Sequence, residues 1–519
     1  MNRFLLLVVA SVGLASAAIQ EPVSVDGGKI TGTPTPQWTY NVRLFRGIPY
    51  AAPPVGDLRW KAPQPVVPWQ GVKAADHFSA VCMQPATETE GNAWREGLVP
   101  MSEDCLYINV WTPAQSPGAK LPVMVFIHGG GNVRGAASEN QYDGAYLAKK
   151  GVVFVSFNYR MNVFGFLAHP DLTKESEHHS SGNYALLDQI AALKWIQKNI
   201  ASFGGDPSTV MIFGHSAGAS NVNALMASPL GKGLFERVLA QSGNSLNTRT
   251  TLSEAEKNGE KFAQGAGASS IAALRQKSAE EILKAPRGQM GPVIDGWVLP
   301  EDVRSIFASG KQIDVPLIIG SVADDTPGPG PAATTAAEAQ AAAKRTYRDK
   351  ADTYLKFYPA DTDAQVAASA HAFRTNSALA GARTWARLQT QSGKSKVYWY
   401  YFTHVSPMPD GLMWGGRTAL SWGAYHGSEI VYVFNAFPLQ DWAWRPMDIK
   451  LGDVVSTMWT NFVKTGSPNG AGVPEWPSYD AKSDVLMEFG DTPKAHTAPY
   501  KDKLDFITDW NTAQQRASR

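Results

Sequence analysis

Residues 210–228 read VMIFGHSAGASNVNALMAS. The apolar segment Val210–Phe213 is typical of a buried β-strand and runs straight into GHSAG at 214–218, after which the composition favours a helix. A sharp turn from strand to helix crowds the side chains two positions before and two positions after its central residue, so glycine is favoured at both places. The stretch therefore predicts a strand–turn–helix unit with Ser216 at the tip of the turn.

Other segments share the character of this strand. They are apolar and nearly continuous, as expected of parallel strands covered by helices on both faces: Val123–Ile127, Val152–Phe157, Val238–Gln241 and Val315–Ile319. Residues Asn183–Ile200 carry apolar side chains every three or four positions, which is the pattern of an amphipathic helix. Strand, helix and strand in this order imply right-handed crossovers, so we predict an α/β fold with a large, mostly parallel central sheet and helices on both faces.

Other parts of the chain differ from this pattern of buried strands and an amphipathic helix. Up to about Trp111 the sequence has short, Pro-rich and strand-like segments such as Leu106–Trp111, which predict antiparallel edge strands and loops. Residues Leu252–Ala308 and Ala332–Tyr354 favour helices, and we expect them to be insertions over one face, that of the active site. Since no repeat or long linker is present, residues 18–519 are expected to form a single domain.

The first residues, MNRFLLLVVASVGLASAA, have the features of a secretory signal. Arg3 precedes an apolar stretch, and Ala15–Ala17 is an A-x-A cleavage site. The alternative is a membrane anchor, but the stretch is shorter than the roughly 20 apolar residues that span a bilayer. We expect residues 1–17 to be a signal peptide cleaved after Ala17, leaving a secreted or periplasmic protein without a membrane span. The net charge of +1 and the absence of a basic run give no indication of nucleic-acid binding.

The chain has two cysteines, Cys82 and Cys105. A disulfide is the default expectation in an exported protein, and two separate buried thiols are the alternative. Two cysteines do not complete a four-ligand zinc site, and no H-E-x-x-H motif occurs. We therefore expect neither a metal nor an organic cofactor.

A serine hydroxyl reacts as a nucleophile only with a base, an acid that orients the base, and donors for the oxyanion. A second glycine-rich turn, HGGG at 128–131, directly follows a predicted strand and supplies such donors. We expect the N–H groups of Gly130, Gly131 and Ala217 to form the oxyanion hole. A phosphate-binding loop is the competing interpretation, but the Lys-Ser/Thr pair and the G-x-G-x-x-G spacing are both missing.

At this point the chain resembles the type-B carboxylesterases, the branch of the α/β-hydrolases that includes cholinesterases and bacterial p-nitrobenzyl-type esterases. The matching stretches follow one another over nearly the whole mature chain: FRGIPYAAPPVGDLRW (45–60), SEDCLYINVW (102–111), FIHGGG (126–131), FNYR (157–160), GNYALLDQIAALKWIQKNIASFGGDP (182–207), GHSAGA (214–219), QSG (241–243) and GAYHGSEIVYVF (423–434). The resemblance implies the α/β-hydrolase fold, ester hydrolysis by a serine triad, and a Cys82–Cys105 disulfide near the mouth of the active site. It also implies two structural ion pairs, Arg59–Glu103 and Arg160–Asp188.

The resemblance further implies the other triad members. The family has its acid in a G-x-x-x-D-E-G turn, where this chain has GSVADDT at 320–326. The family's glutamate therefore falls on Asp325 and its last glycine on Thr326; Asp324 is the fallback acid, and two solvated carboxylates are the alternative. The family's histidine falls on His426. Ser242 matches a serine thought to support the histidine, with local packing as the alternative.

The expected reaction is hydrolysis of a small-molecule ester through an acyl-enzyme. His215 stands where cholinesterases have a glutamate, which favours neutral esters of short to medium chain, and its side chain is expected to point away from the reacting atoms. Asn132 stands where an aromatic residue often follows the three glycines, so we expect a different pocket wall. The alternatives are a lipase, amidase or polyester hydrolase on the same triad, or a non-catalytic binding or adhesion protein. The sequence does not determine the oligomeric state.

Overall fold

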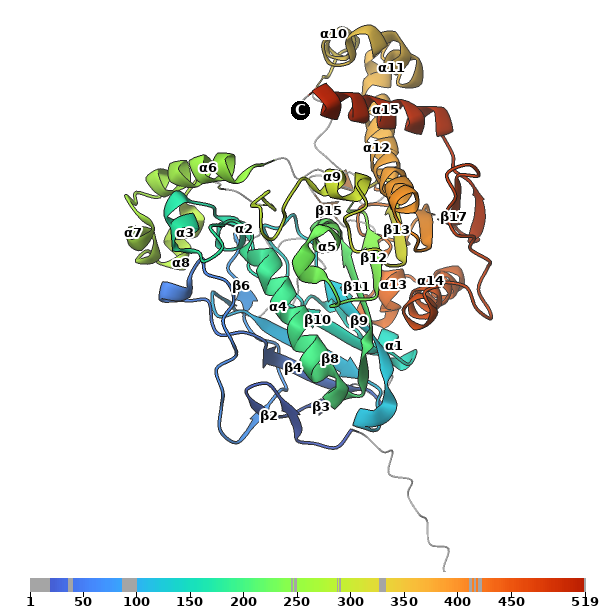
Figure 1. Ribbon diagram of the computed structural model, residues 1–519. Helices are drawn as coiled ribbons and strands as arrows, with labels where there is room; N and C mark the ends of the chain where they lie inside the picture. The colour runs from blue at the N-terminus through green and yellow to red at the C-terminus, as the bar shows by residue number, and fades with distance from the viewer. Residues whose placement is uncertain are drawn as a thin grey trace, which may run out of the picture.

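The computed structural model describes residues 19–35, 41–85, 100–243, 246, 250–286, 288, 291–325, 333–409, 413–414, 417–418 and 422–517. The expected signal peptide at 1–17 and Thr326 lie outside these ranges. Among the described residues, the largest sheet has eleven strands in the order β18-β17-β14-β13-β12-β11-β9-β10-β8-β4-β3 (Figure 1). In chain order these strands are β3 (Thr33–Pro34), β4 (Arg43–Pro49), β8 (Tyr107–Thr112), β9 (Leu121–Ile127), β10 (Val153–Phe157), β11 (Gly205–His215), β12 (Arg237–Gln241), β13 (Leu317–Val322), β14 (Val397–Phe402), β17 (Val485–Phe489) and β18 (Lys494–Thr497).

The pairing confirms the predicted α/β fold. Strands from β10 through β9, β11, β12, β13 and β14 to β17 pair in parallel, whereas β3, β4, β8 and β18 join the edges in antiparallel pairs. Strand β13 begins at Leu317, two residues after the predicted start at Val315. Pro316 precedes it, and proline has no N–H to donate to a ladder.

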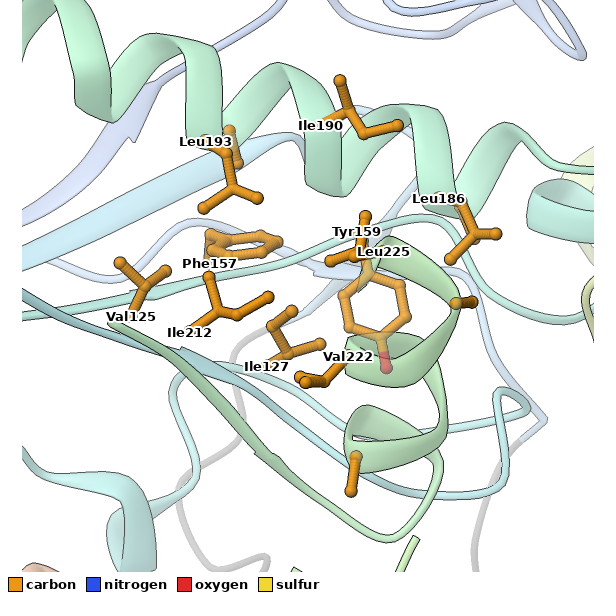
Figure 2. Close-up of a cluster of buried hydrophobic side chains, with 14 of the residues drawn as sticks. Val125, Ile127, Phe157, Tyr159, Leu186, Ile190, Leu193, Ile212, Val222 and Leu225 are labelled. Atoms are coloured by element: carbon orange, nitrogen blue, oxygen red, sulfur yellow. The ribbon is translucent and has the colours of Figure 1, made fainter. Parts of the chain in front are cut away.

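Helices cover both faces of this sheet. On one face α4 (Tyr184–Asn199) and α5 (Ala217–Ala227) pack onto the strands, and Figure 2 shows Leu186, Ile190 and Leu193 of α4 above Val125 and Ile212. The strand residues that alternate with these, such as Met124 and Phe213, point to the other face. There they pack with α1 (Ala145–Lys149), α13 (Ile430–Phe434) and α14 (Pro446–Thr465). The period of two along each strand thus divides the core into two layers.

The predicted helical insertions are present, and they lie in the upper part of Figure 1. They are α6 (Leu252–Gly265), α7 (Ile271–Arg275), α8 (Ala279–Lys284), α9 (Val303–Ala308), α10 (Ala336–Tyr347) and α11 (Ala351–Phe357). The long α12 (Asp363–Ser392) lies outside the predicted segments and packs with the C-terminal α15 (Lys501–Ala517). Thr251 and Glu254 form a capping box at the start of α6, which explains why this polar segment is helical. No helix among the described residues is both long enough and apolar enough to cross a membrane.

Short elements complete the described chain. The small strands are β1 (Val23–Val25), β2 (Gly28–Thr31), β5 (Val72–Ala74), β6 (Val81–Cys82), β7 (Met101–Ser102), β15 (Met413–Trp414) and β16 (Arg417–Thr418). The short α-helices are α2 (Asn162–Phe166) and α3 (Pro170–Glu175). The 3-10 turns are η2 (Gly56–Leu58), η3 (Pro117–Ala119), η4 (Asn140–Tyr142), η5 (Ile200–Phe203), η6 (Pro229–Gly231), η7 (Arg348–Lys350) and η9 (Phe437–Leu439).

Candidate active site

Ser216 lies at the turn between β11 and α5 with φ 59° and ψ −124°, a backbone conformation that residues other than glycine rarely adopt. The two flanking glycines are required by close approach. A Cβ on Gly214 would lie 2.6 Å from the carbonyl carbon of Gly218, and one on Gly218 would collide with the carbonyl oxygen of Ile127. The glycines therefore make the turn possible and leave the serine side chain at its tip.

The structure brings Ser216, His426 and Asp325 together from three distant segments. Nε2 of His426 lies 2.8 Å from the hydroxyl of Ser216, and Nδ1 lies 2.6 Å from Oδ1 of Asp325. With its Nδ1–H donating to the carboxylate, the imidazole has a free lone pair at Nε2 to accept the serine proton. Aspartate thus reaches the base in place of the longer glutamate. The catalytic roles of the three residues stay predictions.

Asp324, the fallback acid, faces elsewhere. Its Oδ1 lies 2.8 Å from Nε2 of His371 on α12, and its Oδ2 accepts the N–H of Ala424 over 2.8 Å. Asp325 is the carboxylate that contacts His426.

The environment makes His426 a stronger base than a free imidazole. Burial lowers its pKa, but the hydrogen bond that its Nδ1–H donates to Asp325 and the negative charge of that carboxylate outweigh the burial. The net result is a pKa above the ordinary value of 6.5. His426 therefore becomes protonated, and unable to act as a base, at a higher pH than an unperturbed histidine.

His215 differs from its sequence-based expectation. Its buried ring packs against that of His426 with 4.6 Å between centroids, instead of pointing away from the reacting groups. Burial, and to a lesser extent the neighbouring His426, hold its pKa well below 6.5. His215 is therefore neutral at pH 7 and places no charge beside Ser216.

The glycine-rich turn lies directly against the nucleophile. A Cβ on Gly129 would lie 2.7 Å from the carbonyl oxygen of His215 and 3.0 Å from Cβ of Ser216. Gly130 and Gly131 have φ values of 105° and 68°, and Gly130 accepts hydrogen bonds from Val133 and Arg134 across the turn. Within the described ranges, the N–H groups of Gly130, Gly131 and Ala217 have no hydrogen-bond acceptor. Their role as an oxyanion hole stays a prediction.

Two polar contacts anchor this turn. Asn132 is buried, and its Oδ1 accepts a hydrogen bond of 2.9 Å from Nδ2 of Asn221 on α5, so its side chain ties the turn to the nucleophile helix. The expected difference in the pocket wall at this position stays a prediction. Gln84 exchanges hydrogen bonds of 2.9 and 3.1 Å with the backbone of Gly135. Gln84 is two residues from Cys82, which forms the predicted disulfide with Cys105.

Ser242 and Glu429 are two further buried polar residues, from the segments that carry the motifs QSG and GAYHGSE. Ser242 is buried, and its hydroxyl has no hydrogen-bond partner among the described residues, so its supporting role stays a prediction. Glu429 was not singled out from the sequence, although an acidic residue directly before the apolar run IVYVF is a usable signal. Burial raises its pKa to about 8, and the charge of Asp325 adds to this effect, while Tyr400, Gln241 and His426 oppose it.

Both expected ion pairs are present. Nε of Arg59 lies 2.6 Å from Oε1 of Glu103, and Arg160 contacts Asp188 through Nε and Nη2 at 2.8 and 2.7 Å. The Arg160–Asp188 pair is fully buried, so it belongs to the scaffold. In the part of the chain that the structure describes, no group of three or more His, Cys, Asp or Glu side chains is arranged to hold a metal ion.

Comparison with known proteins gives a consistent picture. The sequence profile of the carboxylesterase family matches residues 20–507. The chain is 36% identical to the fumonisin B1 esterase of Sphingopyxis macrogoltabida, over 87% of this chain and 84% of the relative. It is 34% identical to the para-nitrobenzyl esterase of Bacillus subtilis, over 88% and 92% of the two chains. A solved structure of PNB esterase superposes with a TM-score of 0.78 at 30% identity, covering 93% of this chain and 99% of that one.

Proposed function

The chain belongs to the carboxylesterase family and is a carboxylic ester hydrolase, and we propose that Ser216 is its nucleophile, His426 its general base and Asp325 the acid that orients the base. The observation that carries this assignment is the position of the His426 ring, with one nitrogen 2.8 Å from the serine hydroxyl and the other 2.6 Å from the carboxylate.

The first half of the reaction forms an acyl-enzyme. His426 takes the proton of Ser216 at Nε2 while the serine oxygen attacks the ester carbonyl carbon. The N–H groups of Gly130, Gly131 and Ala217 donate to the oxyanion that develops. The tetrahedral intermediate collapses, the proton on Nε2 passes to the leaving alkoxide, and the alcohol departs.

The second half releases the acid. His426 takes a proton from water, whose oxygen attacks the acyl carbonyl carbon, and the Ser216–acyl bond breaks as the proton on Nε2 returns to the serine oxygen. Asp325 accepts the Nδ1–H throughout, which holds the productive tautomer and stabilises the imidazolium.

A fluorophosphonate probe tests the assignment, because it reacts only with an activated serine. The wild type is expected to be labelled, and Ser216→Ala, folded to the same thermal stability, is expected not to be. Labelling of both proteins, or of neither, contradicts the assignment of Ser216.

The proposed substrate is a neutral carboxylic ester with a short to medium acyl chain. The neutral His215 supports this choice, because it places no negative charge beside the nucleophile to attract a cationic ester. A series of p-nitrophenyl esters of increasing acyl length is expected to give the highest kcat/KM at short to medium length, and choline esters are expected to be poor substrates. Activation at a lipid interface would indicate a lipase instead, and turnover of anilides an amidase.

The proposed location is outside the cytoplasm, with residues 1–17 removed as a signal peptide and residues 18–519 forming one domain. The Cys82–Cys105 disulfide supports an oxidising compartment. Mass analysis of the mature protein from periplasmic and culture fractions is expected to find Ala18 at the N-terminus. A mature chain that retains Met1 contradicts this proposal.

A further inference from the structure

Asp324 joins the two loops that carry Asp325 and His426. Its N–H donates to the carbonyl of Ala424 over 2.9 Å, and its Oδ2 accepts the N–H of Ala424 over 2.8 Å. Asp324 and Tyr425 also form an isolated parallel bridge. These contacts lie one residue before Asp325 and two residues before His426. They therefore join the loops directly beside the hydrogen bond between the two triad residues.

The second oxygen of the same carboxylate binds a helix. Oδ1 of Asp324 lies 2.8 Å from Nε2 of His371 on α12, which packs against β13. The side chains of His371 and Asp324 are 43% and 27% exposed, so this contact contributes less than the amide contact with Ala424. The carboxylate of Asp324 thus bridges the histidine loop and α12.

The residue before Ala424 leaves room for this bridge. Gly423 has no side chain, and a Cβ at this position would collide with the carboxylate of Asp324. The carboxylate therefore occupies a space that only glycine at position 423 provides.

We propose that Asp324 is a positioning residue: it holds the His426 loop at the separation from which Asp325 reaches Nδ1 of the imidazole. This inference rests on the proposed function of Ser216, His426 and Asp325. Asp324 touches neither the substrate nor the serine, but a displacement of about 1 Å at a reacting group lowers the rate by about 100-fold. A residue that sets the loop separation therefore sets the rate.

Two variants of Asp324 separate its hydrogen bonds from its charge. Asp324→Ala removes both contacts, whereas Asp324→Asn keeps an oxygen for the N–H of Ala424 and directs an amide N–H toward Nε2 of His371. In Asp324→Ala we expect kcat for p-nitrophenyl butyrate to fall about 10- to 100-fold with KM nearly unchanged. In Asp324→Asn we expect kcat to be close to that of the wild type.

A second readout does not depend on turnover. The pKa of His426 is measured by NMR with isotope-labelled histidine; the titratable groups that face this ring are Asp325, Glu429 and His215. Since Asp325 raises this pKa, loosening its contact in Asp324→Ala is expected to lower it, and Asp324→Asn is expected to restore it. Asp206→Ala is the control, because Asp206 also accepts a backbone N–H, that of Ser208, but lies at the start of β11, at the opposite end of this strand from Ser216.

The outcomes distinguish this inference from the proposed function. If Asp324→Ala has the kcat and the His426 pKa of the wild type, the inference is wrong and the proposed esterase function still stands. The same holds if kcat falls as far in Asp324→Asn as in Asp324→Ala. A wild type that cleaves no ester refutes the proposed function, while a lowered pKa in Asp324→Ala still supports the positioning contact. If Asp324→Ala does not fold, Gly423→Ala disturbs the same contact, and wild-type kcat in that variant overturns the inference.

Discussion

The imidazole rings of His215 and His426 lie 4.6 Å apart, centroid to centroid, immediately beside Ser216. A Cβ on Gly427 would lie 3.2 Å from Cε1 of His215, so the glycine after His426 lets the loop approach the His215 ring closely. The ring next to the nucleophile is held neutral, mainly by burial, while the ring that acts as base is made more basic by Asp325. The base therefore faces a neutral ring at position 215, and a charge introduced there would lie directly beside it.

The pH profile follows from this arrangement. His426 acts as a base only when neutral, and its pKa is raised, so kcat/KM is expected to fall on acidification at a pH above 6.5. His215→Glu brings a carboxylate to the ring and is expected to move the acid limb about one further pH unit upward. His215→Gln, which adds no charge, is expected not to move it upward. Profiles of kcat/KM that superimpose for His215→Glu and the wild type would contradict this account.

The two glycines of the predicted oxyanion hole differ in the space around them. A Cβ on Gly130 would collide with the carbonyl oxygen of Arg134, whereas a Cβ on Gly131 meets nothing within 4 Å. Gly130→Ala is expected to displace the turn and lower kcat by about 100- to 1000-fold, the usual effect of losing an oxyanion donor. Gly131→Ala keeps its N–H and is expected to cost only about 1 kcal/mol of stability for its positive φ. A wild-type kcat in Gly130→Ala would mean that the turn does not bind the oxyanion.

The disulfide is expected to support both stability and the glycine-rich turn. Cys82 and Cys105 are 23 residues apart, and closing a loop of this size contributes roughly 3 kcal/mol. Because Gln84 binds Gly135 close to the disulfide, replacing both cysteines with serine is expected to lower kcat as well as the melting temperature. Dithiothreitol is the control: it should bring the wild type to the level of the double variant and leave that variant unchanged. A wild type that keeps full activity after complete reduction argues against the link to the turn.

Glu429 makes stability depend on pH. The folded state keeps its proton up to about pH 8, whereas the unfolded state ionises near the ordinary value of 4.5. The unfolded state therefore binds fewer protons between these values, and the free energy of unfolding falls as the pH rises through this window. Glu429→Gln removes this dependence, so its stability relative to the wild type is expected to rise by about 3–4 kcal/mol from pH 5 to pH 8.

Chemical denaturation at several pH values measures this difference. Glu260→Gln is the matched control, because it makes the same substitution at an exposed position on α6. A stability difference between Glu429→Gln and the wild type that stays constant from pH 5 to pH 8 would falsify the assignment of a buried, protonated Glu429.

The sequence by itself determined the architecture and the order of the candidate triad. Buried parallel strands are recognisable because both of their faces are apolar, and the Ser216 turn is recognisable because only glycine fits on either side of it. Both constraints act on residues that are close together in the chain, so a short stretch of sequence is enough to recognise them. The position of His426 could also be predicted, from the motif that it shares with the carboxylesterases.

Only the tertiary structure decided which side chains meet. Asp324 and Asp325 are adjacent and chemically identical, yet one binds Ala424 and the other His426, because successive side chains of an extended segment point to opposite sides. The family motif favoured Asp325 but left Asp324 as the fallback, because their partners lie about a hundred residues away along the chain and the neighbouring residues do not specify them. The same holds for the ring of His215 against His426, since packing between loops depends on how the whole sheet sets them side by side.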